Sequence, residues 1–169
     1  QKKRYRARIQ LGVETDTLDA DGTVVAVSDQ LPETSQEIET AIVPFRGTTM
    51  QVPPMYSARK VDGERLHKLA RAGKVVEREA REIEIYSLEI LAYESPFLDL
   101  DVLCSKGTYI RSLASDIGSA LGCGGSVTSL RRSQSGSISE GHCVQMDAVA
   151  DTTVSQALID PNDALVELP

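Results

Sequence analysis

Alternation of apolar and polar side chains is the most frequent pattern along the chain, and it predicts several half-buried strands. Charged and apolar residues alternate in residues 4–11. In residues 98–104, apolar residues alternate with Asp99 and Asp101. Further strands are predicted at residues 23–27, 82–90 and 126–130. Within the second of these, the apolar phase slips, which predicts a β-bulge near Ser87.

A period of three to four residues marks the helices. The clearest one is predicted at residues 109–121, where the apolar positions are Ile110, Leu113, Ala114, Ile117, Ala120 and Leu121. Thr34 and Glu37 have the spacing of a capping box, which opens a short helix that Pro44 closes. A third helix is predicted at residues 64–72. Together these elements predict an α+β fold, with a mixed, mostly antiparallel sheet and flanking helices.

The composition is that of an ordinary globular protein, with 169 residues, of which 41% are hydrophobic and 25% charged. No apolar run reaches the roughly 18 residues of a membrane span. The three cysteines, Cys104, Cys123 and Cys143, are widely spaced and form no CxxC pair. His67 and His142 have no partners at metal-ligand spacing. These features predict a reduced, cytoplasmic chain without a disulfide framework, a metal or a membrane span.

The net charge of −7 argues against a nucleic-acid partner, but the charges are unevenly distributed. Eight acids and no base lie between Arg8 and Arg46, and six acids and no base follow Arg132. The rest of the chain, outside these two acidic segments, has a net charge of about +7. Five of its bases lie in residues 2–8 and six in residues 59–74. A basic face can therefore coexist with an acidic total, because phosphates respond to the local field. Scattered, solvated charge is an equally good interpretation.

Three ordered groups of short motifs carry a family resemblance. The first is KRY at 3–5, LG at 11–12, TDT at 15–17 and DADG at 19–22. The second is VPPMYSA at 52–58, Lys60, Gly63 and ARAG at 70–73. The third is CSKGTYIR at 104–111, LG at 121–122 and LRR at 130–132. In this order and at these spacings, the chain resembles the TruB family of bacterial tRNA pseudouridine synthases over residues 3–146.

The resemblance implies a pseudouridine synthase catalytic fold and the isomerisation of one T-loop uridine of tRNA (position 55) to pseudouridine. In that reaction the bond between ribose C1′ and uracil N1 breaks, the base turns, and it rejoins the ribose through C5. The resemblance implies no cofactor and no metal. The target base must leave its stack, at a cost of roughly a few kcal/mol, and then needs a flat partner and hydrogen-bonding groups.

Four residues match positions of the family's uridine site. Tyr5 is implied to stack on the flipped base, and Arg111 to pair with the catalytic aspartate and hold it ionised. Tyr109 and Leu130 are implied to line the pocket. From the pattern alone, Tyr5 could instead be a packed strand tyrosine, Arg111 a solvated helix arginine and Leu130 a core leucine. Tyr56 is expected to pack rather than to touch RNA. The candidates for phosphate contacts are Arg71, Lys106, Arg131 and Arg132.

The resemblance puts the nucleophilic aspartate in a Gly-Thr-Leu-Asp-Pro type motif upstream of the KRY segment, so we expect it to be absent from this chain. The TLD sequence at 17–19 imitates that motif, but it belongs to the connection between two strands. There Asp16 or Asp19 is expected to organise loop hydrogen bonds. On this interpretation residues 1–146 form a partial catalytic domain, residues 147–169 extend it, and the chain alone is inactive.

Two other functions stay open from the sequence. The basic face could belong to a non-catalytic RNA-binding module, with weak, salt-dependent binding to tRNA and no turnover. Alternatively, the acidic segments could dominate in a structural or interaction domain that binds no RNA. We also expect an open sheet edge and apolar surface, which would lead the chain to associate with itself or with a missing N-terminal segment.

Overall fold

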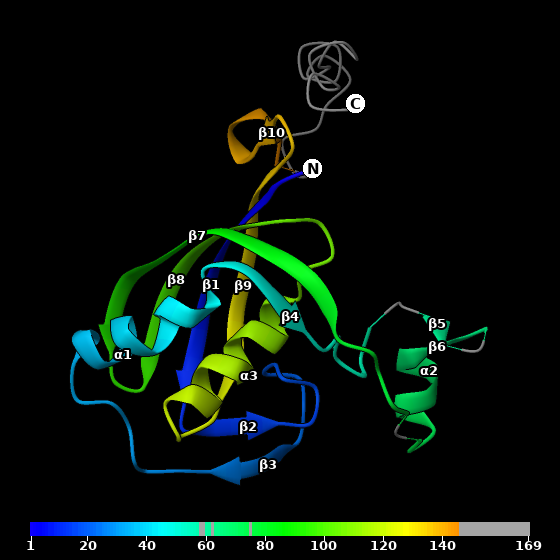
Figure 1. Ribbon diagram of the computed structural model, residues 1–169, viewed down its shortest axis with the longest axis horizontal. Helices are drawn as coiled ribbons and strands as arrows, with labels where there is room; N and C mark the ends of the chain where they lie inside the picture. Colours follow the sequence, from blue (N-terminus) through cyan, green and yellow to red (C-terminus); the bar gives the residue numbers. More distant parts are fainter. Residues whose placement is uncertain (58–59, 62, 75, 146–169) are drawn as a thin grey trace.

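The chain folds around a six-stranded antiparallel sheet with the strand order β10-β9-β1-β8-β7-β4 (Figure 1). The computed structural model describes residues 1–57, 60–61, 63–74 and 76–145. The strands of this sheet are β1 (Lys3–Leu11), β4 (Gly47–Gln51), β7 (Arg81–Glu94), β8 (Phe97–Cys104), β9 (Gly125–Ser135) and β10 (Ile138–Ser139). Each pair of neighbours in it is antiparallel, which confirms the predicted, mostly antiparallel sheet.

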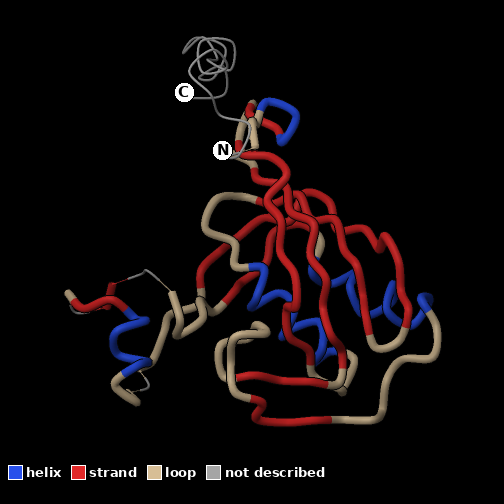
Figure 2. The backbone as a smooth tube through the Cα atoms, turned by 180° about the vertical axis from the view of Figure 1, so that it is seen from behind, coloured by secondary structure: helices blue, strands red, loops and turns tan. Residues whose placement is uncertain are grey.

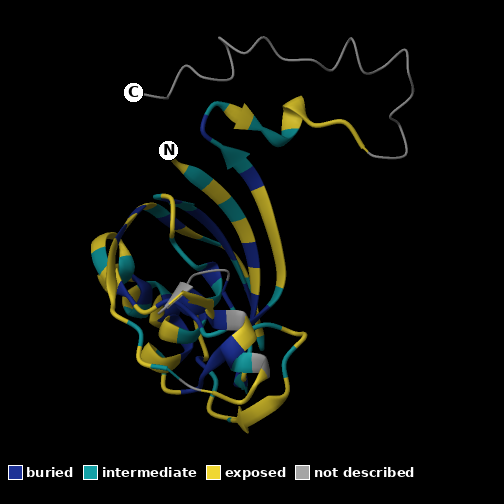
Figure 3. Cartoon of the chain, turned by 90° about the vertical axis from the view of Figure 1, so that its right-hand side faces the viewer, coloured by how far each residue is buried: buried dark blue, intermediate teal, exposed yellow. Residues whose placement is uncertain are grey.

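Two short hairpins stand outside the main sheet. One joins β2 (Val13–Thr15) to β3 (Val24–Val27), and the other joins β5 (Lys60–Val61) to β6 (Glu64–Arg65). β5 and β6 continue into α2 (Leu66–Arg71), and the three form a unit at the side of the sheet (Figure 1). β3 is exposed along its whole length, as the yellow arrow at the bottom of Figure 3 shows.

Two helices, α1 (Ser35–Ile42) and α3 (Ile110–Ala120), cover one face of the sheet, which we call the inner face. They lie in front of the strands in Figure 1 and behind them in Figure 2. Two 3-10 helices, η1 (Val43–Phe45) and η2 (Glu140–His142), follow α1 and β10. The core between helices and sheet is aliphatic, and its residues include Ile9, Leu11, Ile38, Ile42, Ile85, Leu88, Leu98, Leu100, Val102, Leu113 and Ile117.

β1 follows the predicted alternation, and this gives the sheet two chemically different faces. Ala7 and Ile9 are buried on the inner face, whereas Arg6 and Arg8 are exposed on the opposite, outer face. The slip in the apolar phase of β7 is a β-bulge in its pairing with β8, between Ile85 and Ser87, as predicted. The extra residue restores the buried phase in the second half of the strand.

α1 begins at the predicted capping box. Thr34 Oγ1 accepts a hydrogen bond from the Glu37 N–H at 3.3 Å, and the Glu37 carboxylate accepts from the Glu33 N–H at 3.4 Å. Pro44 stands in the first turn of η1, where its missing N–H costs no helical bond. The predicted helix at 109–121 is α3, with Tyr109 as its N-cap residue.

The observed elements also differ from the predicted ones in one helix boundary and one additional strand. α2 begins two residues later than predicted, because residues 64 and 65 are extended and pair as β6 with β5. The sequence also does not predict β4, whose residues GTTMQ lack apolar alternation. β4 is an edge strand that pairs with β7 alone, so its side chains face solvent more than those of a central strand.

Candidate functional site

Arg111, in the first turn of α3, connects this helix to the loop of Thr17 and Asp19 and to the segment of Tyr56. Its Nη1 donates to Thr17 O at 3.1 Å and to Asp19 Oδ2 at 2.7 Å, and its Nη2 donates to Tyr56 O at 2.6 Å. About a quarter of each side chain of the ion pair is exposed, 25% of Arg111 and 24% of Asp19. A charge-assisted bond in this shielded position is stronger than an ion pair in open solvent. The alternative of a solvated helix arginine is therefore wrong.

Asp19 is held by its own loop as well as by Arg111. Its Oδ1 accepts from Thr17 Oγ1 at 2.6 Å and from the Asp21 N–H at 3.3 Å. Asp16 Oδ1 accepts from the Thr23 N–H at 2.8 Å. The loop roles predicted for Asp16 and Asp19 are thus confirmed. The pairing of Asp19 with Arg111 is not predicted, because the two residues lie 92 positions apart and a carboxylate in a tight turn is the only signal in the sequence.

The loop that carries Asp19 is bonded to β9. The Ala20 N–H donates to Val127 O at 2.9 Å, and the Val127 N–H donates to Leu18 O at 3.1 Å. Asp19 and Val127 form an isolated parallel bridge. The ion pair therefore has a fixed position relative to the main sheet.

The proline segment after β4 is fastened through its carbonyl groups. Ser112 Oγ donates to Val52 O at 3.0 Å, and Arg78 Nη1 donates to Pro53 O at 3.0 Å. Backbone carbonyl groups need a donor when they are shielded from water, and here side chains from other parts of the chain supply it. Tyr56 reaches the Arg111 centre through its main-chain oxygen, and its side chain is half-buried.

Tyr5, Leu130 and Arg132 form a second group on the inner face. In the pairing of β1 with β9, Tyr5 lies opposite Arg132 and Ala7 lies opposite Leu130. Directly opposite residues in a sheet present their side chains on the same face. The Tyr5 ring packs at the margin of the core, whereas 46% of Leu130 is exposed. Leu130 is therefore not a core leucine, and it offers apolar surface next to an aromatic ring.

Burial raises the pKa of the Tyr5 phenol, and this effect exceeds the lowering by the nearby Arg132 guanidinium. The ordinary pKa of a tyrosine is about 10. Tyr5 is therefore uncharged at neutral pH and can present its ring as a flat, neutral surface.

β9 joins the two groups. Val127, bonded to the Asp19 loop, precedes Leu130 by three residues, which corresponds to about 10 Å of strand. Tyr109 belongs to the Arg111 side of the site, since it directly precedes α3 and is half-buried. The predicted residues Tyr5, Tyr109, Arg111 and Leu130 thus come from β1, the start of α3 and β9, which are neighbouring elements.

Arg131 and Arg132 point to opposite faces of the sheet. Arg131 lies opposite Arg6, and its Nε donates to Glu140 Oε2 at 2.7 Å on the outer face. Arg6 Nη1 lies 3.5 Å from the other oxygen of Glu140. The bond from Arg131 lowers the pKa of the Glu140 carboxyl. Of the two candidates for phosphate contacts, Arg132 shares a face with Tyr5 and Arg131 does not.

The basic cluster of residues 2–8 is not the open basic face that the sequence suggests. Arg4 Nε lies 2.6 Å from Asp101 Oδ1, and Arg8 Nη2 lies 2.7 Å from Asp99 Oδ2. Arg4 and Arg8 therefore meet carboxylates of β8 across the strand pair, and Arg6 meets Glu140, so the charge of these arginines is largely compensated. The pKa of the Asp99 carboxyl is lowered by the hydrogen bond from Arg8.

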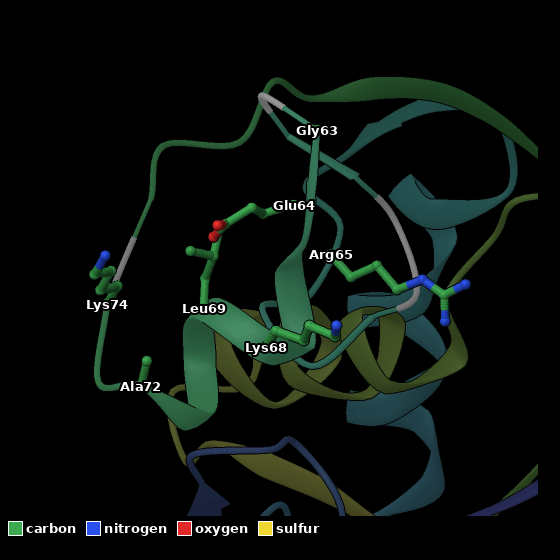
Figure 4. A pocket seen from close by; sticks show the side chains of 7 residues that line it. All are labelled: Gly63, Glu64, Arg65, Lys68, Leu69, Ala72 and Lys74. Carbon is green, nitrogen blue, oxygen red and sulfur yellow. The ribbon is translucent and has the colours of Figure 1, made fainter.

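The second basic cluster does form an open surface, on the unit of β6 and α2. A hollow of about 580 Å³ is bordered there by Gly63, Glu64, Arg65, Lys68, Leu69, Ala72 and Lys74 (Figure 4). Its charged side chains comprise three bases and one acid. Arg71 belongs to α2, but its side chain lies outside the described part of the chain. Lys106 is exposed in the loop between β8 and α3.

Among the described residues, no group of three or more His, Cys, Asp or Glu side chains is arranged to hold a metal ion. The helices of the described part are too short and too polar to cross a membrane. The predicted division into residues 1–146 and 147–169 stays a prediction, because residues 146–169 lie outside the description.

Two models of one protein family match the chain. The model of the N-terminal domain of the TruB family pseudouridylate synthases matches residues 1–110. The model of the tRNA pseudouridylate synthase B C-terminal domain matches residues 111–167. The boundary between the two matches falls at Arg111, so both contribute to the site described above.

Curated proteins of high similarity carry the name tRNA pseudouridine synthase B. The protein of Francisella tularensis subsp. novicida (strain U112) is 48% identical over 157 residues, which cover 92% of this chain and 52% of that protein. The protein of Francisella philomiragia subsp. philomiragia has the same identity and coverage. The chain spans about half the length of the curated relatives that it matches.

Two solved structures share the fold. A chain from the crystal structure of a Cbf5-Nop10-Gar1 complex superposes with a TM-score of 0.61 and 27% identity, over 86% of this chain and 34% of that one. A chain from the structure of an H/ACA RNP bound to a substrate RNA containing 2'-deoxyuridine gives a TM-score of 0.59 and 22% identity, over 94% and 37%. The second likeness concerns the fold alone.

Proposed function

Because the chain belongs to the TruB pseudouridylate synthase family, we propose that it forms the uridine-binding part of an enzyme that isomerises the T-loop uridine of tRNA (position 55) to pseudouridine. The observation that carries this proposal is the Arg111 centre, where one guanidinium joins Asp19 and two loop carbonyls next to β9. The reaction is an isomerisation, in which substrate and product contain the same atoms, and in keeping with the family resemblance no cofactor is proposed for it.

The pocket for the flipped base is proposed to lie at Tyr5 and Leu130. A base removed from its stack loses favourable contacts on both of its flat faces. The uncharged ring of Tyr5 can replace one of them, at about 1–3 kcal/mol per stacked base. The exposed side chain of Leu130 supplies further apolar surface on the same face. Tyr109 is proposed to close the pocket from the start of α3.

Arg111 is proposed to orient the nucleophilic carboxylate. A guanidinium has five N–H donors, and three of them are used in the bonds to Thr17, Asp19 and Tyr56. The remaining two can hold a second carboxylate in its ionised form. Asp19 is not proposed as the nucleophile, since both of its oxygens already accept hydrogen bonds. In keeping with the family motif, we propose that the nucleophile is a residue outside these 169, and we expect the chain alone to be inactive.

We propose that tRNA contacts the basic hollow of α2 as well as the pocket. Arg65, Lys68 and Lys74 all border this hollow (Figure 4). Lys106 and Arg132 are proposed as additional phosphate contacts because both are exposed, the first in the loop before α3 and the second beside Tyr5. We also propose that the enzyme acts in the cytoplasm, in keeping with its three free cysteines.

The test is formation of pseudouridine in a T stem-loop RNA. We would assay the chain alone and then together with the upstream half of the Francisella tRNA pseudouridine synthase B, after showing that the two associate. Activity that requires both pieces, and that is lost in Arg111→Lys, is the expected result. Lysine keeps the charge but cannot make the three bonds of the guanidinium.

Other outcomes would overturn this proposal. Salt-dependent binding of the stem-loop without turnover, by associated and folded pieces, would favour a non-catalytic RNA-binding module. Absence of binding at low salt would favour a structural or interaction domain. Turnover by the chain alone would contradict the assignment of the nucleophile to a residue outside it.

A further inference from the structure

Gln51, the last residue of β4, makes a two-way contact with the backbone of Tyr109. Its Nε2 donates to Tyr109 O at 3.1 Å, and its Oε1 accepts from the Tyr109 N–H at 2.8 Å. Only 3% of Gln51 is exposed. A buried amide that satisfies both polar groups of one distant residue fixes the position of that residue in two directions.

This contact holds the residue at which α3 begins. Tyr109 is the N-cap residue of α3, and its own side chain makes no capping bond. The N-cap residue stands outside the regular backbone geometry of the helix, so contacts with other elements decide its position. Gln51 therefore determines, from another strand, how the chain enters α3.

The residues that follow Tyr109 make the placement relevant to the site. Arg111 lies two positions later, and its three bonds require that the first turn of α3 has one orientation. Ser112, in the same turn, bonds to Val52 O and so joins α3 to the residue after Gln51. The end of β4 and the start of α3 thus form one rigid unit.

We propose that Gln51 is a positioning residue of the uridine pocket, which sets the backbone of Tyr109 and thereby the direction of its side chain. The inference rests on the proposed function. Gln51 should influence the preference of the pocket for uridine and not the general affinity for RNA. The reason is that Gln51 is buried and contacts Tyr109 rather than the outside of the molecule.

The experiment compares binding to two T stem-loop RNAs, one with the target uridine and one with an abasic residue in its place. The ratio of the two dissociation constants is independent of the fraction of folded protein and requires no turnover. In Gln51→Met, which removes both hydrogen bonds at nearly constant volume, the preference for uridine should fall about ten-fold. The affinity for the abasic RNA should stay the same.

Two comparison variants distinguish a specific effect on the position of Tyr109 from a general weakening of the contact between β4 and α3. Gln36→Met changes an exposed glutamine on α1 and should leave the ratio unchanged. Ser112→Ala removes the hydrogen bond from Ser112 to Val52 O, which also joins the start of α3 to the end of β4. This variant should lower the melting temperature and leave the ratio of the two dissociation constants unchanged. If Gln51→Met does not fold, Gln51→Asn, which sets the amide one methylene back, is examined in the same way.

The outcomes distinguish the two proposals. A wild-type protein that prefers uridine, together with a Gln51 variant that keeps this preference, would refute the positioning role alone. An equal loss of preference in Ser112→Ala would also refute it, because any loosening of α3 would then suffice. A wild-type protein with no preference for uridine would instead count against the proposed function.

Discussion

The Arg111 centre explains why an arginine occupies this position and no other basic residue. Its two terminal nitrogens point to different acceptors, Asp19 and Thr17 on one side and Tyr56 on the other. A lysine has a single nitrogen and could not bridge them. The sequence identifies Arg111 by its motif, but its partners become known only from the folded chain.

Replacement of Asp19 by asparagine tests this centre. The amide group is uncharged and would bring its own N–H donors against those of Arg111, so the guanidinium should lose its position. In the assay that combines the chain with the upstream half, we expect Asp19→Asn to lower the rate of pseudouridine formation at least ten-fold, or about 1.4 kcal/mol of activation free energy. Asp16→Asn is the matched control, because Asp16 bonds to the loop backbone at Thr23 and not to Arg111. Equal losses in both variants would show that loop order alone matters.

A second residue-scale prediction concerns the ionisation of Tyr5. Since burial raises the pKa of Tyr5 and Arg132 lowers it, the phenol should titrate above about 10, and Arg132→Gln should raise its pKa further. Arg131→Gln should have no such effect, because Arg131 lies on the outer face. The measurement is an ultraviolet titration, with Tyr5→Phe subtracted to isolate the signal. A pKa at or below 10, or equal shifts in both arginine variants, would contradict the placement.

At the scale of elements, α3 approaches β9 so closely that a side chain is excluded between them. A Cβ at Gly118 would overlap the backbone of Gly124 and Gly125. Gly122 and Gly124 both have a positive φ, which lets the short connection of residues 122–125 turn directly from the helix into the strand. This close approach also keeps the loop of Asp19 near α3, since that loop is bonded to β9.

Gly118→Ala should therefore destabilise the protein. Alanine favours a helix over glycine by up to about 1 kcal/mol, but the overlap is with backbone that cannot move aside. Overpacking of this kind costs about 1–3 kcal/mol, so the net free energy of unfolding should decrease. Urea denaturation measures it, with Ser119→Ala, on the exposed side of the same helix, as the control. An increase in stability for Gly118→Ala would show that α3 and β9 are farther apart.

At the scale of the whole molecule, most of the arginines of β1 are neutralised by acids of β8 and by Glu140, so the net charge of −7 is a poor guide to the surface. The uncompensated bases are concentrated on the α2 unit and near the inner-face site. Binding of RNA should therefore depend on salt through a few contacts only.

With Lys68, Lys74, Lys106 and Arg132 in contact with phosphates, the logarithm of the affinity should fall against the logarithm of the salt concentration with a slope of about −3. Lys68→Gln should remove one phosphate contact, and the slope should therefore become shallower by about 0.7–0.9. Arg8→Gln should not change it, because Arg8 is paired with Asp99 on the outer face. Filter binding of the T stem-loop at several salt concentrations is the measurement. A shallower slope in Arg8→Gln would show that Arg8 contacts RNA, and it would support a basic face that includes residues 2–8.

Much of this protein is determined by the sequence alone. The alternation in β1 and β8, the bulge after Ile85, the capping box of α1 and the extent of α3 were all predicted, because each depends on side chains a few positions apart. The motifs likewise identified the family without knowledge of the fold. What lies close together in the chain can be found by its period and its spacing.

Only the tertiary structure decided which residues meet. Asp19 and Arg111 are far apart in the sequence, and no local pattern distinguishes this carboxylate from Asp16. The same is true of Gln51, whose buried amide holds the N-cap residue of α3 from another strand. The opposite directions of Arg131 and Arg132 follow from the register of β9 with β1, and a slip of one residue would exchange them. Register and long-range bonds are properties of the packed sheet, so they cannot be deduced from neighbouring residues.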